Sequence, residues 1–250
     1  MSSFPIFVTV DGVAPLIVGG GELAAIKARL LLKRAPRIAV AADAMEPALK
    51  ALIESGRIER LAGKPGIEEI RGRPLVISAT GDDDEDARVS ALARSLGVPV
   101  NVPDRPELCT FSLAAIVDRG LVTVAIGTEG AAPVLATQMR ASLERELHPS
   151  LGRLAEIARE YRPVVAEKLP PGARRRDFWE SVFAGQPADA ILSGDEARGR
   201  KLIADLRRQG SGPPLEDPGR DQRAHGFPRP RRQNDRAAQG RRSVHLRPWR

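Results

Sequence analysis

Residues 13–24 read VAPLIVGGGELA, and this stretch decides the fold. Its apolar part, 13–19, is short and ends in glycines, which is typical of a strand buried in a parallel sheet. The following residues, 21–35, have the apolar spacing of an amphipathic helix. The apolar positions of that helix are Leu23, Ile26, Leu30 and Leu31. The stretch therefore predicts a strand, a tight glycine turn and a helix packed on a sheet.

The glycine turn matches the pattern G-x-G-x-x-A, which binds a dinucleotide pyrophosphate when it lies between a strand and a helix. Gly19 allows the tight turn, Gly21 lets the backbone approach a phosphate, and the small Ala24 lets helix and strand pack closely. Backbone N–H groups and the helix dipole then hold the phosphates. We predict that Gly19, Gly20 and Gly21 bind a cofactor; the alternative is a plain βα turn.

Further strands alternate with helices along the first part of the chain, which predicts an α/β fold with a Rossmann-like parallel sheet. Two short strand patterns follow, and the chain then becomes helical. The predicted strands are 37–41, 58–61, 74–79, 98–102, 114–116 and 121–126. The predicted helices are 45–54, 83–96, 133–147, 150–168, 172–184, 187–193 and 195–208.

Asp43 follows the second predicted strand and lies 24 residues after Gly19. A carboxylate there accepts hydrogen bonds from the ribose hydroxyls of the adenosine and repels a 2′-phosphate, so it favours NAD over NADP. The sequence places no arginine in the immediate neighbourhood of Asp43. The alternative is an ordinary surface carboxylate.

Two later strand ends carry further candidates, because ligands of doubly wound folds bind at the carboxyl edge of the sheet. Thr80 is a predicted cofactor contact, and the acids beside it, Asp82 and Asp83, are equally explained as helix caps. Asp104 lies in a proline-stiffened loop, where it is a candidate general base. Taken alone, an aspartate in such a loop is more often a turn residue.

The net charge of +7 resides almost entirely in the tail 211–250, which holds ten arginines and four acids and so contributes +6. The tail lacks apolar periodicity, so we expect a disordered, solvated segment. Alternatives are a nucleic-acid-binding arm or the product of a frameshift or truncation. The single cysteine, Cys109, predicts a cytoplasmic protein without disulfides. No membrane span and no resident metal site are expected, because apolar runs are short and no Cys/His cluster exists.

Several stretches together resemble one known family, the precorrin-2 dehydrogenase/sirohydrochlorin ferrochelatase module, which forms the N-terminal half of siroheme synthase. They occur in that family's order from residue 4 to about 185. The stretches are PIFVTVDGVAPLIVGGGELAAIKARLLL, LVISATGDD, NVPDRPELCTF, AAIVDRGLVTVAIGTEGAAPVLA and RRRDFWESVFAG. The resemblance implies NAD-dependent oxidation of precorrin-2 to sirohydrochlorin, followed by Fe²⁺ insertion to give siroheme.

The resemblance also implies roles for particular residues. The family's catalytic aspartate falls on Asp104, as general base in both reactions, and its cofactor contacts fall on Glu22, Leu23, Asp43 and Ala44. Where the family has Ser-Ser-Gly-Gly, this chain has Gly-Thr-Glu-Gly. The hydroxyl of Thr128 replaces the second serine, and we predict that it contacts the substrate.

The resemblance finally implies a domain arrangement and a homodimer. We expect an NAD-binding Rossmann-like domain over 1–113, a dimerisation segment over 114–148, a helical domain over 149–210 and the tail over 211–250. The methyltransferase that often follows this module is missing from the sequence, so uroporphyrinogen methylation would need another protein. The alternative function is a non-catalytic NAD-binding or NAD-sensing protein on the same fold.

Overall fold

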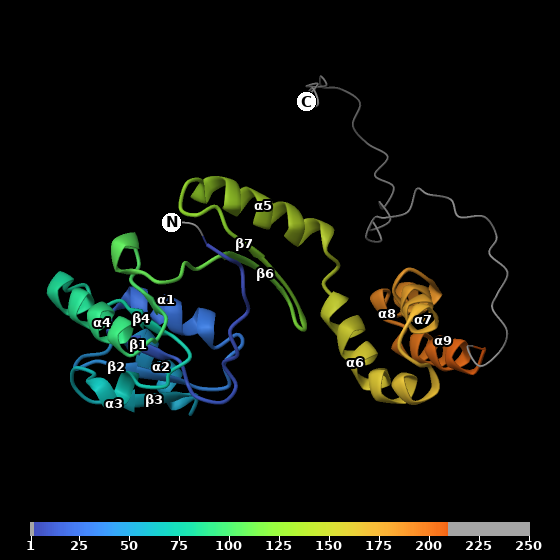
Figure 1. Cartoon of the computed structure of the whole chain (residues 1–250), viewed down its shortest axis with the longest axis horizontal. Coiled ribbons are helices and arrows are strands. Elements are labelled where there is room, and N and C mark those ends of the chain that lie inside the picture. Colours follow the sequence, from blue (N-terminus) through green and yellow to red (C-terminus); the bar gives the residue numbers. More distant parts are fainter. Residues whose placement is uncertain (1–2, 210–250) are drawn as a thin grey trace, which may run out of the picture. The chain divides into compact units, whose positions relative to one another are not determined.

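The computed structural model describes residues 3–209 of the 250-residue chain (Figure 1). The predictions made for the tail 211–250 lie outside the described residues. Contacts within the chain define two compact units. One contains the described residues up to Ala115 together with Ala125–Thr137, and the other contains Ile116–Val124 and the described residues from Gln138 onward. The domain boundaries drawn from the sequence, at 113, 148 and 210, stay predictions.

A five-stranded sheet forms the centre of the first unit, in the order β3-β2-β1-β4-β5, and its neighbouring strands pair in parallel. The central strand pairs on both sides, with Ile17 opposite Val40 of one neighbour and Ile77 of the other. The predicted Rossmann-like parallel sheet is confirmed. The strands are β1 (Leu16–Val18), β2 (Ile38–Ala41), β3 (Ile58–Leu61), β4 (Val76–Ser78) and β5 (Val100–Asn101).

Both faces of the sheet are buried, which explains why its strands are apolar without alternation. Ile17 packs in one hydrophobic cluster with α1 and α2, whereas Leu16 and Val18 pack in a second cluster with α3 and α4. The helices are α1 (Glu22–Leu31), α2 (Pro47–Glu54), α3 (Ile67–Ile70) and α4 (Asp83–Ser95). The four-residue α3 was not predicted, because one helical turn is too short to show a period.

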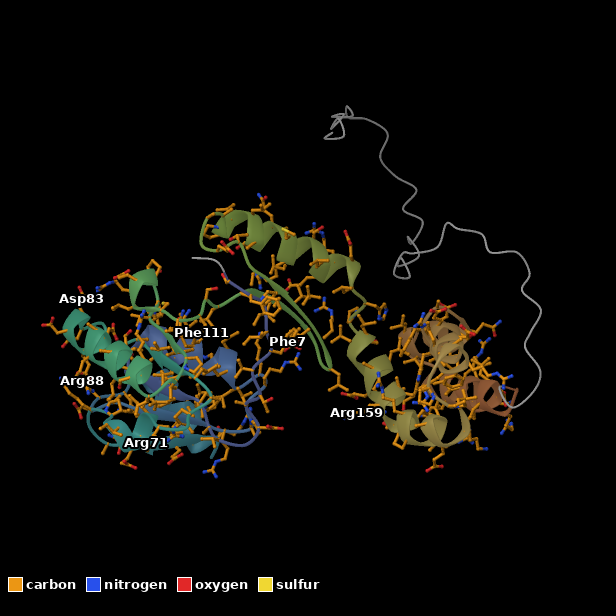
Figure 2. The ribbon with its side chains drawn as sticks, in the orientation of Figure 1. Phe7, Arg71, Asp83, Arg88, Phe111 and Arg159 are labelled. Carbon is orange, nitrogen blue, oxygen red and sulfur yellow. The ribbon has the colours of Figure 1, made fainter. Side chains whose placement is uncertain are left out.

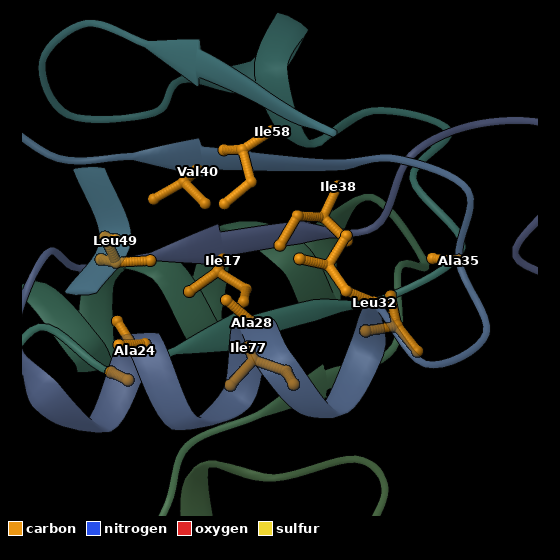
Figure 3. Packing of buried hydrophobic residues seen from close by; sticks show 13 residues of the cluster. Ile17, Ala24, Ala28, Leu32, Ala35, Ile38, Val40, Leu49, Ile58 and Ile77 are labelled. Atoms are coloured by element: carbon orange, nitrogen blue, oxygen red, sulfur yellow. The ribbon is translucent and has the colours of Figure 1, made fainter. Parts of the chain in front are cut away.

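Helix α1 buries a different face from the one that the sequence suggested. Leu23 and Ile26 are 39% and 48% exposed, whereas Ala24, Ala25 and Ala28 are fully buried. Figure 3 shows Ala24 and Ala28 on the side of α1 that faces the sheet. The tight glycine turn brings the helix so close to the strands that alanines fit between them and larger side chains do not. The expected burial of the leucine and isoleucine stripe was therefore wrong at these two positions.

A two-stranded sheet follows, with β6 (Ala115–Arg119) and β7 (Val122–Ile126) joined through Gly120, which adopts a left-handed φ of 66°. The sequence predicted β7 closely and only the start of β6. After β7, α5 (Pro133–Glu146) begins the helical part of the chain.

Four more helices lie in the second unit and pack around a core of their own. They agree with the predicted helices to within one or two residues at each end. Ile157, Val182 and Ile203 are fully buried there. No helix among residues 3–209 is long and apolar enough to cross a membrane. The helices are α6 (Leu151–Lys168), α7 (Ala173–Phe183), α8 (Gln186–Leu192) and α9 (Glu196–Gln209).

Candidate functional site

A cleft of about 230 Å³ lies at the carboxyl edge of the parallel sheet, within the first unit. This edge carries the loops that follow β1, β2, β3 and β4, and the strand order reverses between the neighbours β1 and β4. Ligands of doubly wound folds bind at this reversal. The cleft is lined by Val18, Gly19, Gly20, Ala41, Ala42, Asp43, Ala44, Gly63, Lys64, Pro65, Thr80, Asp82 and Glu85.

Gly19 and Gly20 are required by the protein's own backbone. A Cβ on Gly19 would lie 2.1 Å from the Ala79 carbonyl oxygen, and one on Gly20 would lie 1.8 Å from the Ala44 carbonyl oxygen. Gly19 also has a φ of 121°, a conformation that side chains disfavour. The turn is thus pressed between the loops that follow β2 and β4, which holds the start of α1 at the cleft.

Gly21 is different, because a Cβ there would meet no described atom within 4 Å. It is the N-cap residue of the ten-residue α1, and no side chain caps this helix end. The first backbone N–H groups of α1 are therefore available to an anion beside an open space. This is the arrangement that a dinucleotide pyrophosphate requires, so the residues present fit such a cofactor. Glu22 and Leu23 are exposed on the first turn of α1 and do not line the cleft, so their cofactor contacts stay predictions.

Asp43 and Ala44 lie beside the glycine turn, as expected, but the neighbourhood of Asp43 is not free of arginine. Arg60 of β3 donates from Nη2 to the Asp43 carbonyl oxygen at 3.4 Å. Lys64 lines the same cleft. The expectation failed because Arg60 is 17 residues away in sequence and is brought close only by the parallel pairing of β2 with β3.

Removal of the Asp43 carboxylate is expected to shift coenzyme preference toward NADP⁺. The Asp43→Ala variant loses an acceptor for the ribose hydroxyls and a negative charge, while the cationic Arg60 and Lys64 remain. We expect the ratio of the Kd values for NADP⁺ and NAD⁺ to fall about tenfold, or about 1.4 kcal/mol. Titration calorimetry with both nucleotides measures this ratio. The matched variant Arg60→Ala should weaken NADP⁺ binding alone, and an unchanged ratio in Asp43→Ala would contradict the assignment.

Thr80 lines the cleft, but its hydroxyl is already used inside the turn after β4. The Thr80 hydroxyl lies 2.8 Å from Asp86 Oδ1, and it accepts a hydrogen bond from the Asp82 backbone N–H at 3.0 Å. Asp86 is buried and also accepts from Ser78 Oγ at 2.6 Å. The Asp82 carboxylate accepts hydrogen bonds from two backbone N–H groups at the start of α4. Asp82, and not Asp83, is therefore the N-cap residue of this helix. The cofactor contact of Thr80 stays a prediction.

Sequence reasoning missed the loop after β3, which closes one side of the cleft. Lys64 forms an ion pair with Glu85 of α4 at 3.1 Å, and Arg88 donates to the Pro65 carbonyl oxygen at 2.9 Å. Arg88, which projects from α4 (Figure 2), also forms a two-bond ion pair with Glu85, at 2.9 and 2.6 Å. The available signal was the Gly-Lys-Pro-Gly sequence at 63–66, a turn at the carboxyl end of a strand.

Glu85 makes the stability of the first unit sensitive to acid. Hydrogen bonding to Arg88, aided by Lys64, lowers the pKa of the Glu85 carboxyl despite its burial. A group with a lowered folded-state pKa stabilises the fold above its unfolded pKa of 4.5, and this stability is lost as the pH falls through the folded value. Glu85→Gln should reduce the free energy of unfolding by about 1 kcal/mol at neutral pH. Urea unfolding at neutral pH and below pH 4.5 measures this difference, which should shrink in acid; a constant difference would contradict it.

Asp104 lies in the loop that follows β5, at the same edge of the sheet. Its backbone has a left-handed φ of 62°, and its side chain is exposed. Among residues 3–209, none donates a hydrogen bond to its carboxylate. The neighbouring Arg105 pairs with Asp83 at 2.9 Å. Asp83, labelled in Figure 2, lies on the first turn of α4 and directly follows the cleft-lining Asp82 in the sequence. The loop therefore presents an exposed carboxylate without a hydrogen-bond donor at the edge of the sheet that carries the cleft, a position suited to a general base.

Thr128 lies in the turn between β7 and α5 and is not among the residues that line the cleft. It is half-buried, and its carbonyl oxygen accepts from the Ala131 N–H at 2.8 Å. Glu129 has a left-handed φ of 52°, and its carboxylate accepts from the Ser3 N–H at 3.1 Å. The substrate contact predicted for Thr128 stays a prediction.

The parallel sheet, the compressed glycine turn and the uncapped helix at the switch point define a dinucleotide-binding α/β domain. A family model described as NAD(P)-binding matches residues 6–115, and one described as the sirohaem synthase dimerisation region matches 150–206. The chain is 40% identical to the siroheme synthase of Methylobacillus flagellatus and 42% identical to that of Azotobacter vinelandii, each over 203 residues. The chain is thus a homologue of the siroheme synthases, and the resemblance found in the sequence is confirmed.

The matched region covers 81% of this chain but only 44% of either relative, so the chain spans less than half the length of these siroheme synthases. Among solved structures, the precorrin-2 dehydrogenase SirC has the same fold, with a TM-score of 0.68 and 19% identity. That match covers 82% of this chain and all of SirC. The dimerisation-region match falls on 150–206, whereas the sequence assigned dimerisation to 114–148, and that assignment stays a prediction.

Proposed function

We propose that this chain is an NAD-dependent precorrin-2 dehydrogenase of siroheme biosynthesis, which oxidises precorrin-2 to sirohydrochlorin. The observation that carries the proposal is the exposed Asp104 carboxylate, which has no hydrogen-bond donor among residues 3–209 and lies in the loop after β5, at the same edge of the sheet as the dinucleotide cleft. Homology to siroheme synthases and the fold shared with a precorrin-2 dehydrogenase support the choice of substrate.

NAD⁺ supplies the hydride acceptor when it is bound. The N–H groups at the start of α1 would hold its pyrophosphate, and Gly21 leaves space for the phosphates. Asp43 would accept hydrogen bonds from the adenosine ribose and would disfavour a 2′-phosphate, so NAD⁺ would be the preferred nucleotide. Lys64, held by Glu85, closes the side of the cleft formed by the loop after β3.

Oxidation of precorrin-2 to sirohydrochlorin removes two hydrogens, one as a hydride and one as a proton. Asp104 accepts the proton, since its exposed carboxylate has no competing partner among the described residues. General base catalysis of this kind contributes about 10²–10⁴-fold to a rate. The proton then leaves to solvent, which the exposure of the side chain permits.

We also propose that the chain inserts Fe²⁺ into sirohydrochlorin, with Fe²⁺ as a substrate. Insertion of the metal releases the two pyrrole N–H protons, and the same Asp104 carboxylate accepts them in turn. Thr128 is assigned to the tetrapyrrole side of the site, as the resemblance implies.

We further propose that the protein is a homodimer in the cytoplasm. Support comes from the match to a dimerisation region and from apolar side chains exposed in the first unit. Phe4, Phe7 and Val134 are 85%, 77% and 72% exposed. The Ser3–Glu129 hydrogen bond brings the N-terminal segment to the turn before α5. Light scattering of the purified chain gives the mass, and a monomer would refute the dimer.

The deciding experiment incubates the purified full chain with precorrin-2 and NAD⁺, without oxygen, and follows NADH and sirohydrochlorin by absorbance. The expected result is equal formation of both products. A second incubation adds Fe²⁺ and follows siroheme. Sirohydrochlorin without siroheme would limit the chain to the dehydrogenase. Tight NAD⁺ binding without any turnover would support the alternative, a non-catalytic NAD-binding protein.

A further inference from the structure

The single cysteine of the chain is buried at the base of the loop that carries Asp104. Cys109 is 8% exposed and follows the short 3₁₀-helix Pro106–Leu108. Its sulfur accepts a hydrogen bond from the Val102 N–H at 3.2 Å, and the Asn101 side-chain amide lies 3.5 Å away. The thiol proton has two carbonyl acceptors in reach, those of Val102 at 3.2 Å and Arg105 at 3.3 Å.

These contacts join the two ends of the loop. Other side chains also hold the loop. Ser90 donates to the Leu108 carbonyl oxygen at 2.6 Å, and Arg94 donates to the carbonyl oxygens of Glu107 and Cys109. At the base of the loop, Thr110 Oγ1 accepts from the Val100 N–H at 2.8 Å, and the Asn101 side-chain amide donates to the Phe111 carbonyl oxygen at 3.0 Å. The Arg105 backbone N–H donates to the Val102 carbonyl oxygen at 3.2 Å and closes the turn around Asp104. Among residues 3–209, Cys109 is the residue whose side chain adds hydrogen bonds to the backbone of both Val102 and Arg105.

The loop needs such a constraint because Asp104 is held in a left-handed conformation. Besides Glu129, it is the one non-glycine residue with positive φ among residues 3–209. A non-glycine residue keeps a left-handed backbone conformation only where the surrounding structure fixes it. The direction of the Asp104 carboxylate therefore depends on contacts that fix residues 102 and 105 on either side of it.

We propose that Cys109 is a positioning residue for Asp104: its thiol fixes the backbone on both sides of the carboxylate and so sets where the base points. This inference rests on the proposed function, because it takes Asp104 as the base. The thiol does not take part in the reaction, since it is buried and does not line the cleft. Sulfur suits the role because it accepts and donates weakly at long distances, so one atom serves several backbone groups.

The test compares Cys109→Ser, which keeps a donor and an acceptor, with Cys109→Val and Cys109→Ala, which keep neither. We expect the Cys109→Val and Cys109→Ala substitutions to lower kcat roughly ten- to a hundredfold, as a small misplacement of a reacting group does. Ser should recover part of this loss. The Kd for NAD⁺ should stay unchanged, since the glycine turn is untouched. Because Val fills the space and lacks the hydrogen bonds, full activity of the Val variant would overturn the proposal.

A double-variant cycle with Asp104→Asn separates positioning from general stability. If Cys109 acts through Asp104, Cys109→Val should cause no further loss of kcat once Asp104 is replaced. An equal loss on both backgrounds would refute the positioning role and indicate a structural one.

Hydrogen exchange of the peptide 102–109 gives a readout that needs no turnover. Faster exchange in this peptide alone, in both Cys109→Val and Cys109→Ala, is expected. If the wild-type chain does not oxidise precorrin-2, the proposed function fails, while the exchange result still decides whether the thiol holds the loop. If peptide 102–109 exchanges at the wild-type rate in both variants, the inference is overturned.

Discussion

Replacement of Asp104 by alanine or asparagine is expected to lower kcat for precorrin-2 oxidation by about 10²–10⁴-fold, because the reaction then lacks its base. The Kd for NAD⁺ should not change, since Asp104 does not line the nucleotide cleft. The fold should also be preserved, because the carboxylate is exposed and accepts no hydrogen bond from a described residue. Steady-state kinetics and nucleotide titration together measure this pattern.

The matched control is Asp84→Asn, which removes another exposed carboxylate from the same edge of the sheet. Asp84 lies on the first turn of α4, and its side chain forms no hydrogen bond or ion pair with residues 3–209, so the variant should retain wild-type kcat. Comparable losses in the Asp84 and Asp104 variants would show that the negative charge of this edge matters, rather than a base at Asp104.

Gly20→Ala is expected to lower the free energy of unfolding by about 3 kcal/mol. The added methyl group would lie 1.8 Å from the Ala44 carbonyl oxygen and 3.0 Å from the Ala42 side chain. A backbone carbonyl cannot move aside as a flexible side chain can, so the loop after β2 must shift. Since that loop carries Asp43, the affinity for NAD⁺ should fall as well. Urea unfolding and nucleotide titration measure the two effects.

Gly21→Ala is the comparison that separates folding from binding at the same turn. The added methyl group meets no described atom, so the free energy of unfolding should fall far less than in Gly20→Ala, by the roughly 0.5–1 kcal/mol that alanine costs at a helix N-cap. The NAD⁺ Kd should nevertheless rise, because the space beside Gly21 is where we place the pyrophosphate. A Gly21→Ala protein as unstable as Gly20→Ala, or a Gly20→Ala protein as stable as the wild type, would contradict this assignment of the two glycines.

Much of the site could be predicted because it depends on local patterns. The strand, the glycines and the helix that follows are contiguous, so their geometry is set within about twenty residues. Asp104 could be proposed from its loop and its place after a strand. Arg60 and Glu85 could not be found in this way, because parallel pairing and helix packing bring them to the cleft from distant positions in the chain.

The sequence by itself determined the α/β class, the glycine turn, the position of Asp104 and the family. The tertiary structure decided which face of α1 is buried, because the approach of helix to sheet excludes Leu23 and Ile26 and admits alanines. It also decided that position 20 has no room for a side chain, whereas the space beside Gly21 is open. Both outcomes depend on the distance between segments that are far apart in the sequence. The spacing of apolar residues within one segment does not contain that distance.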